Sequence, residues 1–344
     1  MPLPGLGVSP GAGALFSELT SITRRCFVPR LFVQIYFGSP TLFYMTGNAQ
    51  RAAGGLNQVT IPLQGSSMVQ GQFTGYGGGF NSPTIIPAIQ NAQFNLAYWV
   101  CPVPLPFGET IIQATDKEIS VLKARMNDVY AVTRQNMARL VFTNNGGNPL
   151  YPNSFLDAFD NGTNFPTYGG ISRVAAGNSA FQGQYINCAS GTFSMASISR
   201  ANMANLLAYV TDKAGGEAPT FVVMSPGDYA RLNMDFIGVE QIHSNPGQSF
   251  SMDTAARSSF PNLNVSGIPI FADHFCPTGS FYGVNCKYTA MYLSEDAAFD
   301  FSGFYSLVPL GQIGQQGVVV VGYNMITAKS SANFWAYGLA GAVF

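Results

Sequence analysis

The apolar positions of this chain change their spacing several times, and each spacing predicts a different element. Near the start, Phe16, Leu19, Ile22 and Cys26 recur at helical spacing before a proline ends the pattern. This spacing predicts one short amphipathic helix. The remainder of residues 1–50 shows no such period, and we expect it to be an extended arm.

The following segment alternates and is rich in glycine. From Val59 to Leu63, apolar residues alternate with polar residues or with Pro62, which is the pattern of an edge strand. The Gly-rich run Gly71–Phe80 comes after it. We therefore expect residues 51–92 to form a long two-stranded excursion with a flexible tip.

A strand that enters the core is predicted next, because Phe94, Leu96, Tyr98 and Val100 occupy alternate positions.

The clearest helix comes after this strand. Thr115 and Glu118 match a capping box, and the apolar residues after them keep a three-to-four spacing. A helix over residues 117–140 would be about 36 Å long at 1.5 Å per residue. Eight of the 33 charged residues lie between Asp116 and Arg139, so the outer face of this helix should carry much of the charge.

The second half of the chain mixes helices and strands. Met203, Leu206, Leu207 and Val210 predict a helix. The other expected elements are a loop at 144–167, a buried strand at Phe221–Met224, a helix that begins at Ser225–Asp228, a loop at 242–259, strands with turns in 265–284 and 287–301, and a final pair of strands that begins at Val318–Val321.

The composition is poor in charge. Charged residues make up only 10% of the 344 residues, and the net charge is −1, whereas soluble domains carry about 25% charged residues. A weakly charged surface favours association. The balance excludes a basic protein that coats nucleic acid, an acidic tail protein and an intrinsically disordered chain. We expect a subunit that buries much of its surface in its neighbours.

Few residues could carry catalysis, because the chain has only two histidines. Asp273 and His274 could be half of a triad, but adjacent side chains in a strand point to opposite faces. A structural role is favoured for this pair, and His243 lies in polar sequence. We therefore predict that the protein is not an enzyme, with no catalytic residues and no bound cofactor.

His274, Cys276 and Cys286 could bind a metal ion, but no fourth ligand and no paired Cys-x-x-Cys motif is apparent. Buried thiols in a hairpin are the favoured explanation, so no metal site is predicted. The five cysteines are odd in number and scattered, which predicts free thiols and folding in a reducing compartment.

Two further features, a glycine run and the basic residues of the long helix, could in principle bind phosphate or nucleic acid. The run Gly75–Gly79 lacks the G-x-G-x-x-G spacing of a phosphate-binding loop, so the favoured interpretation is a mobile loop or a surface that packs closely against another backbone. The helix charges could face nucleic acid, although interleaved carboxylates favour a solvated or inter-subunit face. These basic residues are Lys123, Arg125, Arg134 and Arg139.

Several stretches resemble the major capsid proteins of tailed bacteriophages, which share the HK97-like fold. The matching stretches are FNLAYWVCPVPLPFGE at Phe94–Glu109, TYGGISR at Thr167–Arg173, PTFVVMSPGDYARL at Pro219–Leu232 and VSGIPIFADHFCPTGSFYGVN at Val265–Asn285. The resemblance rests on their order and spacing. The sequence departs from the family pattern at Asn178–Phe181, where relatives often show an Asn-Pro-x-Trp-like stretch.

The resemblance implies an α+β, HK97-like fold. Its segments would be an N-terminal arm at 1–50, an E-loop at 51–95 that reaches over an adjacent subunit, a P-domain at 96–170 with its spine helix at 117–140, an A-domain at 171–317 whose tip loop at 242–259 meets its copies, and P-domain return strands at 318–344.

It also implies a function. The chain would self-assemble as hexamers and pentamers into an icosahedral phage head that encloses double-stranded DNA without sequence specificity. Assembly would take place in the host bacterial cytoplasm, and the mature location would be the virion capsid. The partners would be other copies of the chain, a portal, and scaffolding or decoration proteins where the virus has them, with no membrane contact.

Some members of this family join an E-loop lysine to an asparagine of a neighbour by an isopeptide bond. In this chain no lysine precedes Lys117, so the predicted E-loop has no amine to offer, and we expect a non-covalent shell.

Two alternative functions remain open. An encapsulin-type protein compartment shares this fold and would bind a cargo peptide on its inner face. A secreted β-rich adhesin or glycan binder would explain the glycine and aromatic content, but it would usually bring a signal sequence. The start of this chain has neither a basic region nor an unbroken apolar stretch.

Overall fold

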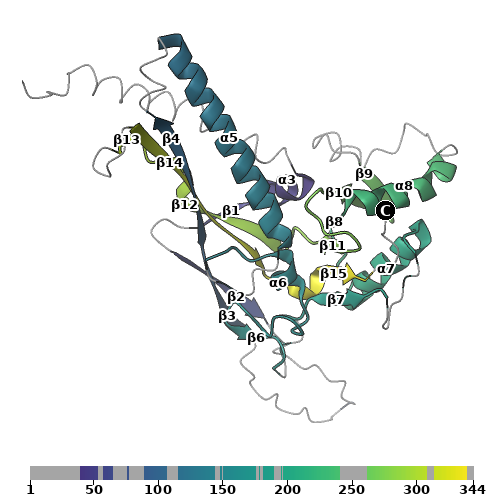
Figure 1. Cartoon of the computed structure of the whole chain (residues 1–344). Coiled ribbons are helices and arrows are strands. Elements are labelled where there is room, and N and C mark those ends of the chain that lie inside the picture. Colours follow the sequence, from purple (N-terminus) through teal and green to yellow (C-terminus); the bar gives the residue numbers. More distant parts are fainter. Residues whose placement is uncertain are drawn as a thin grey trace, which may run out of the picture.

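The computed structural model (Figure 1) describes most of the chain from Ser39 to Gly338. The described residues are 39–52, 57–64, 89–106, 115–143, 150–175, 181–189, 197–240, 262–307 and 314–338, with the single residues Tyr76, Asn148, Asn178 and Met195. Among them no helix is long and apolar enough to cross a membrane.

Two sheets organise the described residues. The five-stranded sheet has the order β1-β12-β14-β13, and β4 pairs with β14 along the edge opposite β12 and β13. Its strands are β1 (Gln50–Ala52), β4 (Ala97–Pro106), β12 (Thr289–Phe301), β13 (Tyr305–Ser306) and β14 (Gly314–Thr327).

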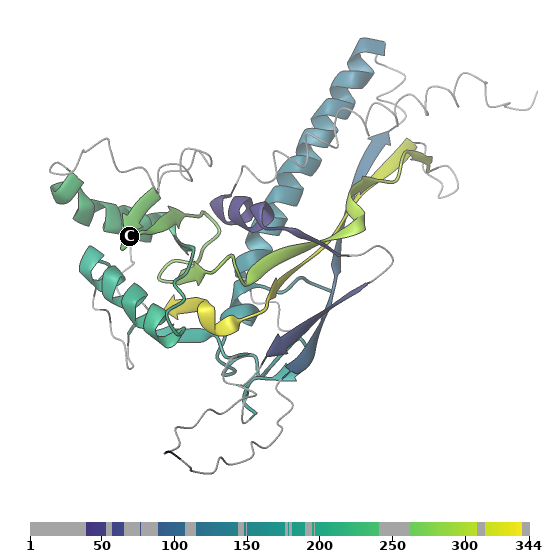
Figure 2. The same cartoon turned by 180° about the vertical axis from the view of Figure 1, so that it is seen from behind.

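The long helix α5 (Thr115–Phe142) runs along one face of this sheet, as Figures 1 and 2 show. The indole N–H of Trp99 donates to the Thr133 hydroxyl at 3.3 Å. Met126, Val129 and Met137 of the helix are buried in the same core as Cys101, Val103 and Leu105 of β4. The predicted long helix is therefore confirmed.

The second sheet has six strands in the order β7-β15-β11-β8-β10-β9. Its central strand β8 (Phe221–Met224) is buried on both faces. Phe221 and Val223 contact the core beneath α5, whereas Val222 and Met224 contact the core beneath α7 and α8. The other elements are β7 (Gln184–Asn187), β9 (Asn262–Val265), β10 (Ile268–Ala272), β11 (Phe281–Val284), β15 (Phe334–Tyr337), α7 (Arg200–Lys213), α8 (Pro226–Glu240) and the short helix η4 (Ser330–Ala332).

Several sequence predictions hold in this part of the fold. The four apolar residues that predicted α7 are all buried, and β8 is the buried strand that was expected. Helix α8 begins where its capping residues placed it, since the N–H of Asp228 donates to the hydroxyl of Ser225 at 3.2 Å.

The Gly-rich excursion has the expected two-stranded base. Strands β2 (Gln58–Gln64) and β3 (Ile89–Asn95) form an antiparallel pair, which we call the base hairpin. The predicted tip, with Gly71–Phe80, lies outside the described residues apart from Tyr76. The loop predicted at 242–259 and the helix predicted around Phe16 also lie outside them.

The prediction that residues 1–50 are extended is wrong at their end. Helix α3 (Pro40–Gly47) follows the N-cap Ser39, and its Leu42 and Met45 are fully buried. The loop predicted at 144–167 likewise contains α6 (Phe155–Phe159), which starts with a capping box between Ser154 and Asp157.

The prediction for the strand at 94–100 is wrong for two of its four side chains. Phe94 and Leu96 are buried, but Tyr98 and Val100 are exposed. The neighbours Leu96 and Ala97 are both buried because the chain passes from β3 to β4 between them. A shift of one residue moves every later side chain to the other face.

Both strands of the predicted final pair occur, as β14 and β15, but they do not pair with each other, because they belong to different sheets. Strand β15 pairs with β7 and β11. Strand β12, which falls within the segment 171–317 assigned to an A-domain, pairs with β1 and β14 in the five-stranded sheet. The five-segment division by residue number stays a prediction.

Candidate functional site

Asp273 and His274, the candidate catalytic pair, point away from each other. The Asp273 carboxylate is buried and accepts hydrogen bonds from the hydroxyls of Ser39 and Thr41 and from the N–H of Phe275. His274 is exposed. The carboxylate therefore holds the start of α3 against the end of β10, which is a structural role. The other histidine, His243, lies outside the described residues.

The three candidate metal ligands are not brought together as a site. Within the described ranges, no group of three or more His, Cys, Asp and Glu side chains is placed to hold a metal ion. Cys276 lies in the turn before β11, and its thiol contacts the main-chain oxygen of Ser280 at 3.5 Å. Cys286 follows β11, and burial raises the pKa of its thiol to about 11.

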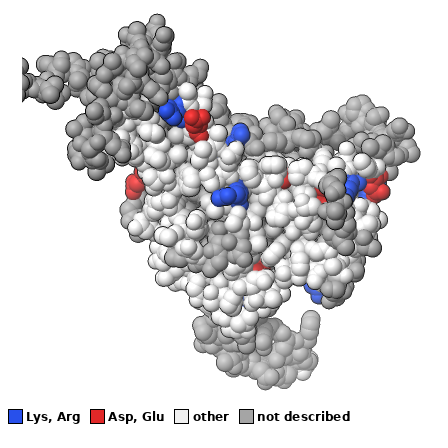
Figure 3. Space-filling model, in the orientation of Figure 1, with Lys and Arg blue, Asp and Glu red and all other residues white. Residues whose placement is uncertain are grey.

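The charged side chains that the structure describes on α5 lie on its outer side. Asp128, Arg134 and Arg139 are exposed and Arg125 is half-buried. Figure 3 shows how sparse the charged residues are on this side of the molecule, where most of the described surface is uncharged. The side chain of Lys123 is outside the described residues, as is the Gly75–Gly79 run apart from Tyr76.

An apolar surface lies on the face of the five-stranded sheet opposite α5, and it is bordered by the exposed Asp300, the cross-strand partner of Val320. Tyr98 and Val100 are exposed over 43% and 55% of their surface. Val100 is the cross-strand partner of Val320, and Pro102 is the partner of Val318, so these side chains share one face. We call this surface the outer sheet face; its residues are Tyr98, Val100, Pro102, Pro104, Val318 and Val320.

The prolines of β4 affect how another chain could meet this surface. Pro102, Pro104 and Pro106 occupy alternate positions that pair with β14. Since proline has no N–H, these three must point their nitrogen atoms toward the free edge of β4. That edge lacks donors there, which disfavours the addition of a further strand. Another subunit would therefore bind more favourably to the face of this sheet than to the edge of β4.

The base hairpin presents an uncharged, polar surface. Gln58, Asn91, Gln93 and Asn95 are exposed on its outward face, and the Gln58 amide donates to the Gln93 and Asn95 side-chain oxygens at 3.4 Å. Its inward face includes the buried Leu63, Ala92 and Phe94. The hairpin is thus attached to its own subunit by one face and offers amide groups on the other.

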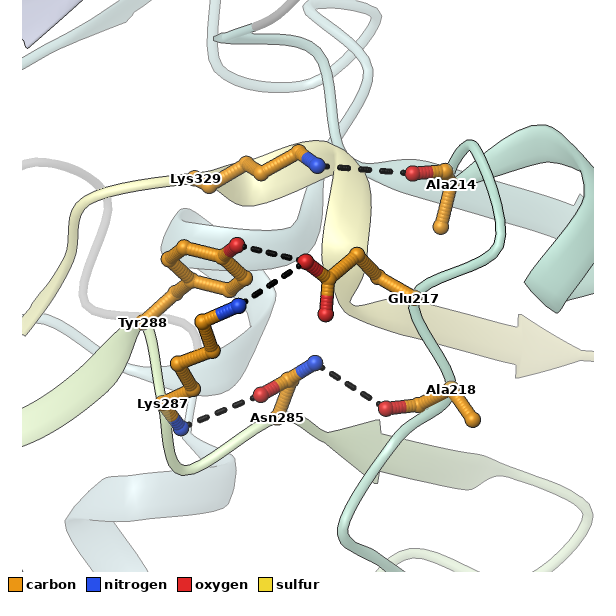
Figure 4. Close-up of polar contacts among 7 residues, drawn as sticks. All are labelled: Ala214, Glu217, Ala218, Asn285, Lys287, Tyr288 and Lys329. Carbon is orange, nitrogen blue, oxygen red and sulfur yellow. Dashed lines mark hydrogen bonds and ion pairs between the residues drawn. The ribbon is translucent and has the colours of Figure 1, made fainter.

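A polar junction connects the loop after α7 with the two sheets (Figure 4). Glu217 accepts hydrogen bonds from the Tyr288 hydroxyl at 2.8 Å and from the Lys287 ammonium at 3.0 Å. These two bonds hold the pKa of Glu217 below its ordinary value, and the bond from Tyr288 has the larger effect. The ammonium of Lys329 donates to the main-chain oxygen of Ala214 at 3.4 Å. The junction joins segments that are far apart in the sequence.

Comparison with known proteins identifies the fold. A chain of the cyanophage A-1(L) capsid asymmetric unit superposes with a TM-score of 0.61 at 16% identity, over 88% of this chain and 93% of that one. A capsid chain of the native GTA particle gives 0.51 at 12% identity, with coverage of 86% and 89%. A chain of the bacteriophage PhiM1 mature capsid gives 0.50 at 10% identity, with coverage of 86% and 87%.

No protein-family model and no curated protein matches the sequence. The likeness is therefore structural, and it shows the α+β, HK97-like capsid fold that the sequence stretches predicted. The outer sheet face was missed by the sequence reasoning. Its signal was present in the prolines at 102, 104 and 106, because they alternate with the apolar residues that fill the core.

Proposed function

We propose that this protein is a major capsid protein, which self-assembles as hexamers and pentamers into an icosahedral phage head around double-stranded DNA. The observation that carries the proposal is the likeness to a phage capsid chain over 88% of this chain and 93% of that one. Its role would be structural rather than enzymatic, and its location would be the virion after assembly in the host cytoplasm.

The surfaces of the subunit support self-assembly. Head-to-tail contacts between copies close into rings, and each copy then needs two different surfaces that fit each other. The outer sheet face is apolar and is bordered by one charge, that of Asp300, whereas the outward face of the base hairpin is uncharged and carries amide groups. Covering the outer sheet face removes apolar area from water. The amide groups of the hairpin then need hydrogen-bond partners on the neighbour or in water, because burying them unpaired would be costly. We propose that the hairpin of one subunit covers the outer sheet face of its neighbour.

The other proposed partners follow from the same role. DNA would lie against the inner side of the shell without sequence recognition. Each phosphate that basic residues of the shell neutralise would strengthen the retention of the genome. A net charge of −1 therefore suits a container from which the DNA must later leave. A portal would complete the head, with scaffolding or decoration proteins where the virus encodes them.

A matched pair of variants tests the proposal. Val100→Lys places a charge on the outer sheet face, and Val132→Lys places one on α5, where the valine is exposed to a similar extent at 43%. Sedimentation of the purified proteins should show shells of many subunits for the wild type and for Val132→Lys, and free subunits for Val100→Lys.

The outcomes separate the claims. A wild-type protein that stays monomeric at all concentrations contradicts the capsid function. Shells that form equally well with Val100→Lys contradict only the role of the outer sheet face. Shells that are isolated from infected or expressing cells with a protein cargo, and that never contain DNA, would assign the encapsulin-type function instead.

A further inference from the structure

The base hairpin is attached to the body of the subunit through a tight turn between β5 (Thr167–Tyr168) and β6 (Ile171–Ser172). The N–H of Gln93 in β3 donates to the main-chain oxygen of Gly169 in this turn at 2.9 Å. The ring of Phe94 lies 4.9 Å from that of Tyr168. We call residues 167–173 the mount.

A second link runs beside the first. The amide of Gln90 donates to the side-chain oxygen of Asn178 at 3.1 Å, and Asn178 in turn donates to the main-chain oxygen of Ser172 at 2.7 Å. Asn178 is buried. Strand β3 therefore contacts the mount at both ends, through a main-chain bond near Gln93 and a side-chain bridge at Gln90.

A buried arginine at the end of the mount, Arg173, fixes the mount to the body of the subunit. Arg173 is fully buried, its guanidinium donates to the main-chain oxygen of Ala158 at 3.1 Å, and it lies over the Tyr168 ring at 4.6 Å. Burial lowers the pKa of Arg173. The Tyr168 hydroxyl accepts a hydrogen bond from the N–H of Thr327 in β14 at 3.1 Å. The turn is thus tied to α6 and to the five-stranded sheet.

Gly169 and Gly170 form the turn, and both have positive φ, of 58° and 80°. Their surroundings differ. A Cβ at Gly169 would lie 2.6 Å from the ring of Phe94 and 2.9 Å from the Cβ of Ala92, whereas a Cβ at Gly170 would meet nothing within 4 Å. The spacing between the hairpin and the mount therefore depends on the absence of a side chain at residue 169 alone.

A cavity lies next to the contact between the base hairpin and the mount. Its volume is about 160 Å³, and it is lined by Phe94, Asn95, Gly169, Gly170 and Asn324, among others.

We infer that the mount sets the angle at which the base hairpin leaves the subunit, and that Gly169 is the positioning residue for contact with the next subunit. The inference rests on the proposed shell-forming function, because the angle matters only if the hairpin reaches a neighbour. If the hairpin leaves every subunit at the same angle, the closed assembly has one curvature. A small change of this angle at residue 169 would recur in every subunit, and the changes would add up around each ring.

The test compares Gly169→Ala with Gly170→Ala in the full chain. Both changes place a side chain at positive φ, so they share the backbone strain, and only Gly169→Ala forces the hairpin away. Hydrogen exchange of the Gln93 amide in unassembled subunits should rise by about tenfold or more in Gly169→Ala relative to Gly170→Ala. The melting temperatures of the two subunits should be similar. Assembly into closed shells should be lost or give open sheets only in Gly169→Ala.

A second-site change distinguishes a displaced hairpin from a destabilised subunit. Phe94→Leu removes the ring atoms that a Cβ at residue 169 would meet, although the contact with Ala92 remains. The double variant Gly169→Ala/Phe94→Leu should therefore recover part of the Gln93 protection and part of the closed shells, even though Phe94→Leu alone removes core volume.

Two results would overturn the inference. One is equal Gln93 exchange and equal assembly in the two glycine variants. The other is a loss of shells in Gly169→Ala that tracks a fall in melting temperature and is not relieved by Phe94→Leu. If the wild type forms no shells, the proposed function fails, and the exchange experiment still decides whether the mount holds the hairpin.

Discussion

The Asp273 carboxylate accepts a hydrogen bond from the Thr41 hydroxyl at 2.6 Å, which joins the start of α3 to the end of β10. The same oxygen accepts from Ser39, and both partners are buried. A helix near the beginning of the chain is thereby held against a strand of the six-stranded sheet.

Asp273→Ala should destabilise the subunit by at least about 2 kcal/mol, because it leaves buried hydroxyl and N–H groups without an acceptor. His274→Ala is the matched control. This neighbour is exposed, so its replacement should change stability by less than about 0.5 kcal/mol. Denaturant unfolding of the unassembled subunit measures both. Equal effects of the two changes would contradict the structural role of Asp273.

The polar junction should make stability depend on pH in the acidic range. The hydrogen bonds from Tyr288 and Lys287 lower the pKa of Glu217 from 4.5 in the folded protein. A lowered carboxyl pKa contributes stability that is fully present above pH 4.5 and is lost as the pH falls through the folded-state pKa. The effect should be small, because the Lys287 and Glu217 side chains are 64% and 31% exposed.

Melting curves of the wild type and Glu217→Gln test this prediction. The difference between their melting temperatures should be constant from neutral pH down to about 4.5 and should shrink below it. Glu295→Gln, at an exposed residue of β12, provides the control for loss of one negative charge. A difference that grows as the pH falls would contradict the stated direction.

All five cysteines should be free thiols. Cys101, Cys188, Cys276 and Cys286 are free in the structure, and Cys26 lies outside the described residues. Burial raises the pKa of the Cys188 and Cys286 thiols to about 11, so these two should react slowly with an alkylating agent in the native subunit. Denaturation without reductant should add five labels, as mass spectrometry would show. Fewer labels, restored to five by reductant, would reveal a disulfide.

The assembled shell should be non-covalent. The only lysines are Lys117, Lys123, Lys213, Lys287 and Lys329, so neither strand of the base hairpin carries an amine. Mature particles boiled in SDS should run as a single band near 36.7 kDa. A ladder of multiples of this mass would show cross-linked subunits and contradict the prediction.

Local patterns predicted the elements whose own residues repeat regularly. Helix α5 was found because its apolar residues keep one period over many turns. Helix α3 was missed because Leu42, Phe43, Tyr44 and Met45 form an unbroken apolar run with no period to reveal a face.

Contacts between distant segments could not be predicted in the same way. Strand β15 lies between β7 and β11, and nothing within its four residues FWAY says which sheet will accept it. The outer sheet face depends on a one-residue shift at Leu96–Ala97, which moves Tyr98 and Val100 outward. The mount depends on the approach of Gly169 to Phe94, which only the folded chain brings together.

The central claim is that copies of this chain close into a shell. Negative-stain electron microscopy of the purified, concentrated protein tests it most directly. We predict closed, hollow particles of uniform diameter, whose class averages show rings of five and six subunits. A field of separate subunits that stays unchanged across concentration and pH would contradict the account.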